Sequence, residues 1–202
     1  MSGSAGRLVV AHHGCDRKVR DALLDGSLDL KPSSNPYDWL GPGIYFFEDD
    51  WKRALYFAQT AAANPERKYT AKPIEKPSVV GVILRVERWL DMATQEGIDE
   101  FLIAHQSLVK VMHAKGTKMP INKPASDDDK EMLLRNLDRA VFKLLHEGRM
   151  QQGLPIYQAV RGPFTQGDPV VDTSAIRRHT HIQLAVPQSD CIVGYFRVRE
   201  AE

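Results

Sequence analysis

A chain of 202 residues with 43% hydrophobic content is long enough to bury the core of one ordinary globular domain. Its 27 Lys and Arg residues nearly balance 26 Asp and Glu residues, so no attraction of the whole molecule to nucleic acid or acidic membranes is expected, although a local basic patch stays open. The two cysteines lie far apart without a CxxC pattern, which indicates neither a disulfide framework nor a zinc finger. With no apolar run of signal-peptide or membrane-span length, we expect a cytoplasmic protein and no membrane segment.

The first half of the chain alternates between strand and helix patterns. A short strand, "RLVVAHHG", ends at Gly14, and the helix that follows it stops at Gly26. A second strand, "GIYFF", precedes a helix over 50–63, which Asn64-Pro65 ends. The stretch "SVVGVILRVERWL" is then the strongest strand pattern of the sequence.

The middle of the chain is predicted to be helical, and the C-terminal third returns to strands. Apolar spacing predicts one helix over 94–115 and a second from the acidic run after Ser126 to Gly148. Three strands follow, in "PIYQAVRG", "THIQLAV" and "CIVGYFRVR". Strands at both ends predict a single α+β domain over 1–202, with a helical insertion at about 91–153 and terminal strands that meet in one sheet.

Common nucleotide-binding and hydrolase motifs do not occur in the sequence. There is no GxGxxG after a strand, no GxxxxGK[ST], no HExxH, no GxSxG and no EF-hand loop. A dinucleotide-binding Rossmann unit, a P-loop and the standard hydrolases are therefore not supported.

Three shorter motifs remain as candidates for chemistry. The first is His13-Gly14 at the end of a strand, and the second is the stretch from Gly43 to Tyr45 with Tyr56 in the following helix. The third is "HTHIQLAV", where strand alternation places His179, His181 and Gln183 on one face. Each motif also has a structural interpretation, as a packed histidine, core tyrosines or the solvated face of an edge strand.

Taken together and in this order, the motifs resemble the His-Tyr-Glu branch of the ADP-ribosyltransferase family, which includes the poly(ADP-ribose) polymerases and diphtheria toxin. In that branch, a first strand ends in His-Gly, and a second carries Gly-Ile-Tyr-Phe before a helix with another tyrosine. A late strand supplies a glutamate. Tyr45 and Tyr56 are eleven residues apart, the separation of polymerase-type members. The helical insertion matches nothing in the family.

The resemblance implies a split, mainly antiparallel sheet with flanking helices, and NAD as the substrate. Tyr45 and Tyr56 would hold the two faces of the nicotinamide ring, and His13 would bind a ribose hydroxyl. The backbone of Gly14 would approach the carboxamide, and Gly43 would belong to the same cofactor site. Nicotinamide would then leave, and an acceptor would attack the anomeric carbon of an oxocarbenium-like ribose.

Gln183 stands where the family most often has glutamate. A neutral amide can hold a ribose hydroxyl, but it supplies no negative charge and cannot act as a base. We therefore expect single transfer instead of chain elongation. Glu48, or Asp49 or Asp50 beside it, is a candidate for a substituting carboxylate.

Further residues are second-tier candidates or departures from the family pattern. His181 shares the predicted strand face of Gln183, Arg161 could meet the acceptor or the pyrophosphate, and Trp39 could line the pocket. Cys15 follows His-Gly where a hydroxyl residue is common, and Arg53 replaces a serine that helps to bind the carboxamide in the polymerases.

The expected function is mono-ADP-ribosylation, the transfer of ADP-ribose from NAD to a protein or nucleic-acid acceptor, as in a toxin or defence effector. A toxin would imply an antitoxin or immunity partner. An NAD glycohydrolase and an inactive module that binds NAD or ADP-ribose are alternatives in the same fold. A metal-dependent enzyme is a further alternative, in which His12, His13, His179 and His181 gather with a cysteine, although their spacing matches no common zinc site.

Overall fold

The computed structural model describes residues 6–35, 38–67, 70, 72–127, 129 and 131–199. The strands are β1 (Arg7–Asp16), β2 (Ile44–Glu48), β3 (Pro77–Val86), β4 (Trp89–Asp91), β5 (Ala159–Phe164), β6 (His181–Val186) and β7 (Ile192–Arg197). The helices are α1 (Arg17–Leu24), α2 (Trp51–Ala63), α3 (Gln95–Ala114) and α4 (Asn136–Gln151), with short 3-10 turns η1 (Pro65–Arg67) and η2 (Ser189–Cys191).

The strands form one sheet in the order β4-β5-β6-β2-β1-β3-β7. Every neighbouring pair is antiparallel except β4 and β5, which are parallel and are connected through α3 and α4. Such a parallel connection needs a long crossover, which the helical middle segment supplies. The predicted α+β class with a mainly antiparallel sheet is confirmed.

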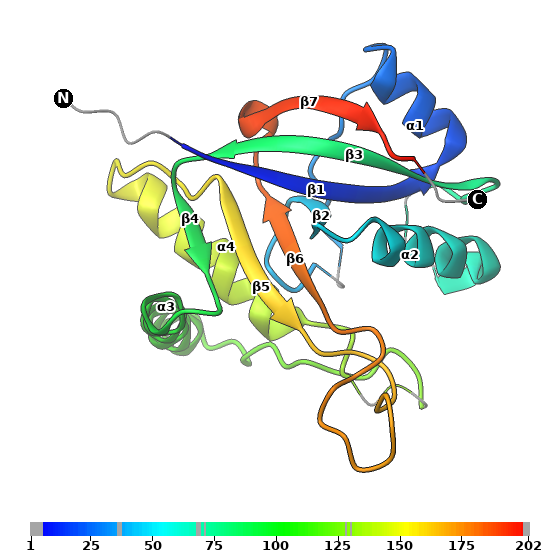
Figure 1. Cartoon of the computed structure of the whole chain (residues 1–202). Coiled ribbons are helices and arrows are strands. Elements are labelled where there is room, and N and C mark those ends of the chain that lie inside the picture. The colour runs from blue at the N-terminus through cyan, green and yellow to red at the C-terminus, as the bar shows by residue number, and fades with distance from the viewer. Residues whose placement is uncertain are drawn as a thin grey trace.

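The sheet has two halves that are joined weakly at its centre. β1 pairs with β3 at every position from Arg7 to Asp16, whereas β1 and β2 pair only at Ala11 with Glu48 and at His12 with Phe47. Figure 1 shows β1, β3 and β7 running across the view, at a steep angle to β5 and β6. The two halves therefore open away from each other next to the pair of His12 and Phe47.

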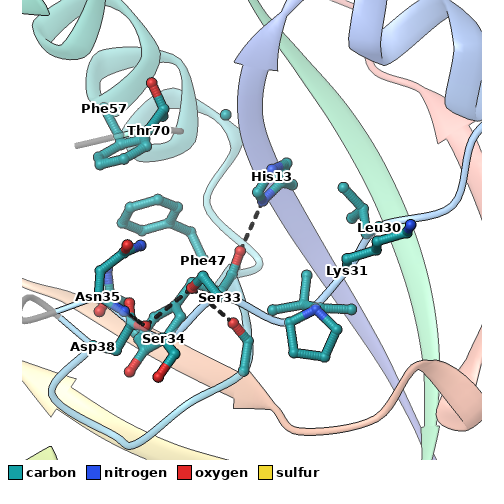
Figure 2. Close-up of a pocket in the computed structure, with 16 residues that line it drawn as sticks. His13, Leu30, Lys31, Ser33, Ser34, Asn35, Asp38, Phe47, Phe57 and Thr70 are labelled. Atoms are coloured by element: carbon teal, nitrogen blue, oxygen red, sulfur yellow. Dashed lines mark hydrogen bonds between the residues drawn. The ribbon is translucent and has the colours of Figure 1, made fainter. Parts of the chain in front are cut away.

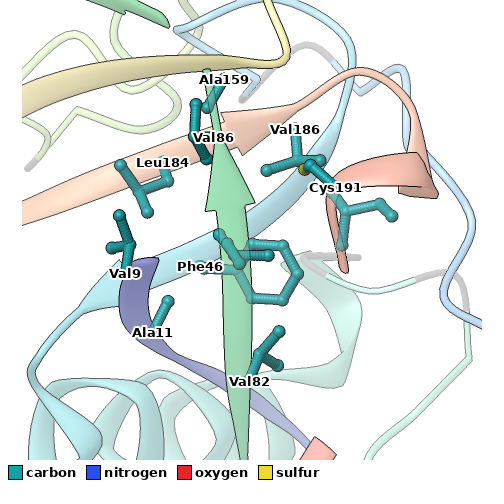
Figure 3. Packing of buried hydrophobic residues seen from close by; sticks show 11 residues of the cluster. Val9, Ala11, Phe46, Val82, Val86, Ala159, Leu184, Val186 and Cys191 are labelled. Carbon is teal, nitrogen blue, oxygen red and sulfur yellow. The ribbon is translucent and has the colours of Figure 1, made fainter. Parts of the chain in front are cut away.

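The main core fills the space between these halves (Figure 3). Its buried side chains are Val9, Ala11, Ile44, Phe46, Val82, Leu84, Val86, Ala159, Leu184, Val186 and Cys191. Because successive strand residues point to opposite faces, the alternation that buries Val9 and Ala11 also turns His13 toward this inner side. The same alternation that builds the core therefore places His13 where the two halves of the sheet separate.

The helices cover the remaining apolar faces of the sheet. Ala54 of α2 packs on Phe47 and Val79, and Leu23 of α1 packs on Val80. The helices α3 and α4 bury a separate cluster against β4, β5 and β6. Among the described residues, no helix is both long and apolar enough to cross a lipid bilayer.

The strongest predicted strand is divided into two. The chain leaves β3 at Glu87-Arg88, and Trp89–Asp91 then forms β4 at the opposite edge of the sheet. The side-chain Oε1 of Gln158 accepts hydrogen bonds from the backbone N–H groups of Glu87 at 2.9 Å and of Arg88 at 3.3 Å. These bonds satisfy the backbone at the break, and no local sequence pattern reveals them.

The second helix of the middle segment begins later than predicted. α4 starts at Asn136, and the described acidic residues before it, Asp127, Asp129 and Glu131, lie outside the helix. The carboxylate of Asp129 accepts hydrogen bonds from the backbone N–H groups of Ala125 at 2.7 Å and of Glu131 and Leu133 at 2.8 Å. An aspartate that captures several backbone donors competes with the helix for them, so the acidic residues are not a helix N-terminus here.

The same helix also ends later than predicted. It continues through Gly148 to Gln151, and the chain turns at Gly153, which has a φ of +69°. A positive φ favours glycine, so Gly153 is the stop signal in place of Gly148. Asp128 and Lys130, inside the predicted helix, lie outside the described residues.

Candidate functional site

A pocket of about 510 Å³ opens where β1 and β2 part (Figure 2). Its volume lies within the range of roughly 300–1,000 Å³ that is usual for small-molecule sites. The residues that line it include five candidates from the sequence, His13, Gly14, Gly43, Tyr45 and Gln183. His13 and Gly14 belong to β1, Tyr45 to β2, and Gln183 to β6, while Gly43 directly precedes β2. The three strands are neighbours in the sheet, in the order β6-β2-β1.

His13 bridges the opening between the two strands with its side chain. Its Nδ1 lies 2.8 Å from the backbone carbonyl oxygen of Tyr45. Because a carbonyl oxygen can only accept, Nδ1 is the donor, and the neutral ring keeps Nε2 as an acceptor. Burial lowers the pKa of His13, although the Tyr45 carbonyl opposes this effect, so the ring is neutral near pH 7. The pocket thus contains a fixed hydrogen-bond acceptor.

Two glycines allow backbones to approach closely at the pocket. A Cβ atom at Gly14 would lie 2.1 Å from the carbonyl oxygen of Ala54 in α2. A Cβ at Gly43 would lie 3.0 Å from the backbone nitrogen of Val186 in β6. Larger residues would therefore push α2 away from β1, or β6 away from the chain entering β2.

Tyr45 lines the pocket while its hydroxyl group is held in the turn before β2. The hydroxyl donates to the carbonyl oxygen of Gly41 at 2.8 Å and accepts from the backbone N–H of Leu40 at 2.9 Å. Burial raises the pKa of Tyr45 well above its usual range, and the negative charge of Asp38 adds to this effect. Tyr45 is therefore a protonated, positioned ring and not a base.

Gln183 reaches the pocket with its amide orientation determined by Trp39. The indole Nε1 of Trp39 donates to Oε1 of Gln183 at 2.5 Å. Because an indole N–H only donates, the oxygen must face Trp39, and the NH₂ group has no hydrogen-bond acceptor among the described residues. Trp39, which the sequence left open as a lining residue, does not line the pocket and contacts it through Gln183.

Asp38, next to Trp39, is a pocket residue that the sequence reasoning missed. Its side chain is 5% exposed, and its Oδ2 accepts from Ser33 Oγ at 3.1 Å and from the backbone N–H of Asn35 at 2.5 Å. Burial raises the pKa of Asp38, and the two hydrogen bonds and the positive charge of Arg139 oppose that rise. The sequence signal that could have identified Asp38 is its position as an acidic residue directly before a tight turn containing Gly41.

The inserted helix α4 supports the loop that carries Asp38. Arg139 Nη2 donates to Ser34 Oγ at 2.6 Å, and Ser34 lines the pocket. Gly41 has a φ of +88°, and a Cβ at this position would lie 2.8 Å from Cβ of Phe142 in α4. The helical middle segment therefore supports one wall of the pocket.

Tyr56 does not line the pocket, which corrects the prediction of a two-tyrosine clamp. Its ring is 42% exposed and stacks on His179, with ring centroids 4.4 Å apart and an angle of 18° between the planes. The guanidinium of Arg53 lies 5.3 Å from the centroid of the Tyr56 ring. Phe57 lines the pocket instead, because adjacent residues of a helix point about 100° apart.

Arg161 and Glu48 pair with each other and do not line the pocket. Arg161 Nε lies 2.6 Å from Glu48 Oε2, and its Nη1 lies 3.1 Å from Asp91 Oδ2. Asp50 is the N-cap of α2, with its carboxylate accepting from the backbone of Arg53 at 2.9 Å. None of the carboxylates that the sequence suggested as a substitute for glutamate is therefore a pocket residue, and this includes the exposed Asp49.

His181 is buried beside the pocket residues but does not line the pocket. Its Nδ1 lies 2.6 Å from the carbonyl oxygen of His179, and its ring packs 5.0 Å from that of Phe47. Burial lowers its pKa to about 4. His181 is thus a neutral core side chain on an interior strand, which differs both from the predicted site role and from the solvated face of an edge strand.

The histidines do not gather into a metal centre in the part of the chain that the structure describes. His12 packs against Phe196, 6.0 Å away, while His13 points to the opposite face of β1. No group of three or more His, Cys, Asp or Glu side chains in those residues could hold a metal ion. Cys15 is buried, and burial raises its thiol pKa to about 12, so it is not a reactive thiolate.

Comparison of the chain with protein-family models, with curated proteins and with solved structures gives no match.

Proposed function

We propose that the protein is a mono-ADP-ribosyltransferase that uses NAD as its substrate. One observation carries this proposal. The His-Gly, Gly-Ile-Tyr and Gln motifs, which are separated by up to 170 positions between His13 and Gln183, contribute to one pocket at the junction of the two half-sheets. The resemblance assigned these motifs to a single NAD site on the basis of sequence alone.

The pocket residues match the parts of NAD in their chemistry. Tyr45, Phe47 and Phe57 supply aromatic surface for a flat cationic ring. Nε2 of His13 accepts a hydrogen bond from a ribose hydroxyl, and the NH₂ of Gln183 donates to a ribose oxygen. Fixed partners of this kind orient the bond between nicotinamide and ribose for cleavage, and the acceptor then attacks the anomeric carbon.

The acceptor is proposed to be a protein or a nucleic acid, and it receives one ADP-ribose group. Gln183 has no charge and cannot remove a proton from an incoming ribose hydroxyl. A polymerase must activate such a hydroxyl repeatedly. An acceptor that is already a good nucleophile has no such requirement, so single transfer suits this site.

The deciding measurement is the release of nicotinamide from NAD by the purified protein, with and without cell lysate as the source of acceptor. Tyr45→Ala and Gln183→Ala change the pocket, while Tyr56→Ala is a matched control because Tyr56 lies outside it. We expect release that requires lysate, falls at least about 100-fold in both pocket variants and persists in the control.

The other outcomes identify the alternatives. Release that is independent of lysate would indicate a glycohydrolase. If nicotinamide is not released but NAD still raises the unfolding temperature, the protein is a binding module. If the protein does not release nicotinamide and NAD does not raise its unfolding temperature, the proposed function is overturned.

A further inference from the structure

The pocket contains one carboxylate, at a position that no motif indicated. Among the described residues that line it, Asp38 is the only Asp or Glu. Figure 2 shows Asp38 beside Ser33 and Asn35, on the other side of His13 from Lys31. We propose that Asp38 supplies the negative charge that faces the cationic part of the substrate, an inference that rests on the proposed function.

The charge of Asp38 is not neutralised by a direct ion pair. The nearby cation, Arg139, donates to Ser34 Oγ at 2.6 Å, and no salt bridge joins it to Asp38 in the described part of the chain. Of the other titratable side chains lining the pocket, His13 and Tyr45 are neutral near pH 7, and Lys31 is exposed. A buried carboxylate that is hydrogen-bonded but has no ion pair among the described residues is available to a cationic ligand.

The chemistry of NAD cleavage provides the matching positive charge. The nicotinamide ring of NAD⁺ is cationic, and positive charge develops on the ribose carbon as the ring leaves. A carboxylate in a site of low dielectric stabilises such a cation more strongly than it would in water. Asp38 would thus perform electrostatically what the glutamate of the resembled family is positioned to perform.

The neutral amide at position 183 is consistent with this arrangement. Trp39 follows Asp38 in the chain and donates to Gln183, and Asp38 and Gln183 both line the pocket. Two carboxylates sharing one site repel each other, and one of them then becomes protonated. With Asp38 ionised, an amide at position 183 keeps a single negative charge in the pocket.

The competing interpretation is that Asp38 only holds its own loop together. The two hydrogen bonds that its carboxylate accepts from described residues, from Ser33 Oγ and from the backbone of Asn35, end on the same oxygen, Oδ2. Asp38→Asn can place its amide oxygen there, so the substitution keeps both bonds and removes the charge. Ser33→Ala does the reverse, because it removes the hydroxyl that lies within hydrogen-bond distance of both Asp38 Oδ2 and the Gly43 carbonyl oxygen, and it keeps the charge. The two variants therefore separate the interpretations.

The first test compares the binding of NAD⁺ and NADH by titration calorimetry, because the reduced ring is neutral. We expect the wild type to prefer NAD⁺ by about tenfold, and we expect this preference to disappear in Asp38→Asn and to persist in Ser33→Ala. Asp25→Asn is the charge control, since Asp25 is an exposed loop aspartate that also accepts from its own loop, at 2.9 Å from the Ser27 nitrogen. It should keep the preference.

The second test measures nicotinamide release by the same variants. We expect Asp38→Asn to lower kcat about 100-fold, with a larger effect than Ser33→Ala. Adding Gln183→Glu to Asp38→Asn returns a carboxylate to the same pocket and should recover at least part of this loss. Thermal unfolding checks that each variant is folded. The recovery of kcat in the double variant can be measured even if Asp38→Asn alone is less stable than the wild type.

The outcomes distinguish this inference from the proposed function. If the wild type releases nicotinamide and Asp38→Asn does so equally well with the same NAD⁺ preference, Asp38 is a loop residue and only the inference fails. If the NAD⁺ preference depends on Asp38 but nicotinamide is never released, the charge assignment holds and the transferase proposal fails. A wild type that binds neither dinucleotide overturns both.

Discussion

The indole nitrogen of Trp39 lies 2.5 Å from the side-chain oxygen of Gln183, across 144 positions of sequence. The close approach of Trp39 to β5 depends on Gly162, because a Cβ there would lie 2.6 Å from Cη2 of Trp39. One aromatic side chain therefore connects the turn at 38–41 with β5 and β6. It determines which end of the Gln183 amide meets a ligand.

Trp39→Phe should uncouple this amide from the turn. The phenyl ring keeps most of the packing on Phe164, whose ring centroid is 5.1 Å away, but it has no N–H to donate. We expect a loss of about 0.5–1.5 kcal/mol in the free energy of unfolding. Nicotinamide release should fall about tenfold or more, mainly in kcat. An unchanged kcat would mean that the orientation of Gln183 does not depend on the indole.

Phe57→Ala and Tyr56→Ala test which aromatic side chain of α2 belongs to the pocket. Only Phe57 lines it, whereas Tyr56 stacks outside on His179. We expect Phe57→Ala to weaken NAD binding about tenfold, as measured by calorimetry, because it removes aromatic surface from the site. Tyr56→Ala should cost about 1 kcal/mol of stability through the lost stacking and leave NAD affinity within about twofold. The reverse result would restore the two-tyrosine clamp.

Gly14→Ala should be strongly destabilising. The new Cβ would lie 2.1 Å from the Ala54 carbonyl oxygen, and a backbone atom cannot move aside as a flexible side chain could. We expect a loss of about 2 kcal/mol or more in denaturant unfolding. Gly148→Ala is the matched control, because nothing lies within 4 Å of that Cβ in α4, and alanine should stabilise the helix by about 0.5–1 kcal/mol. Equal effects at the two sites would contradict this packing.

Arg161→Met should lower stability without a direct effect on the pocket. It leaves the carboxylates of Glu48 and Asp91, 14% and 19% exposed, without their shared cation. We expect a cost of about 2–4 kcal/mol, somewhat less than for a completely buried pair. Activity per folded molecule, assayed well below the unfolding temperature, should stay within a few-fold of wild type. A large drop in kcat at full folding would assign Arg161 to substrate binding after all.

Stability should fall as the pH decreases from about 6.5 to about 4. Burial lowers the pKa of both His146 and His181 to about 4, below the value of about 6.5 expected in the unfolded chain. Between these pH values, the two histidines bind protons in the unfolded chain but not in the folded protein. Each histidine therefore lowers the free energy of unfolding by up to roughly 3 kcal/mol.

Urea titrations at several pH values measure this dependence. His146→Gln should flatten it, because glutamine does not titrate. The variant should differ from wild type more at pH 7.5, where the wild-type histidine is neutral, than at pH 5. An identical pH slope in both proteins would show that His146 is not responsible for the effect.

Local signals in the sequence were sufficient for the first elements of the fold. Asp16, Asp50 and Thr94 cap α1, α2 and α3 within their own segments, and Gly26 adopts a φ of +78° just after α1. Because these caps and turns involve residues close together in the chain, the boundaries of β1, β2, α2 and α3 could be predicted within a few residues.

Long-range partners decided the places where the sequence failed. The break between β3 and β4 depends on Gln158, about 70 positions away, and the pocket side of α2 depends on how Ala54 packs against Gly14. Neither relationship leaves a periodic pattern in the sequence. The helix rotation that selects Phe57 over Tyr56 follows from this packing.

The sequence by itself determined the strand and helix types, the residues of the three motifs and the inner orientation of His13, since these follow from local hydrogen bonding and from side-chain alternation. Only the tertiary structure decided that β1 and β2 separate after two residue pairs, and that Asp38 is the carboxylate in the resulting pocket. A pocket forms where segments distant in sequence fail to pair, and no local pattern records where pairing stops.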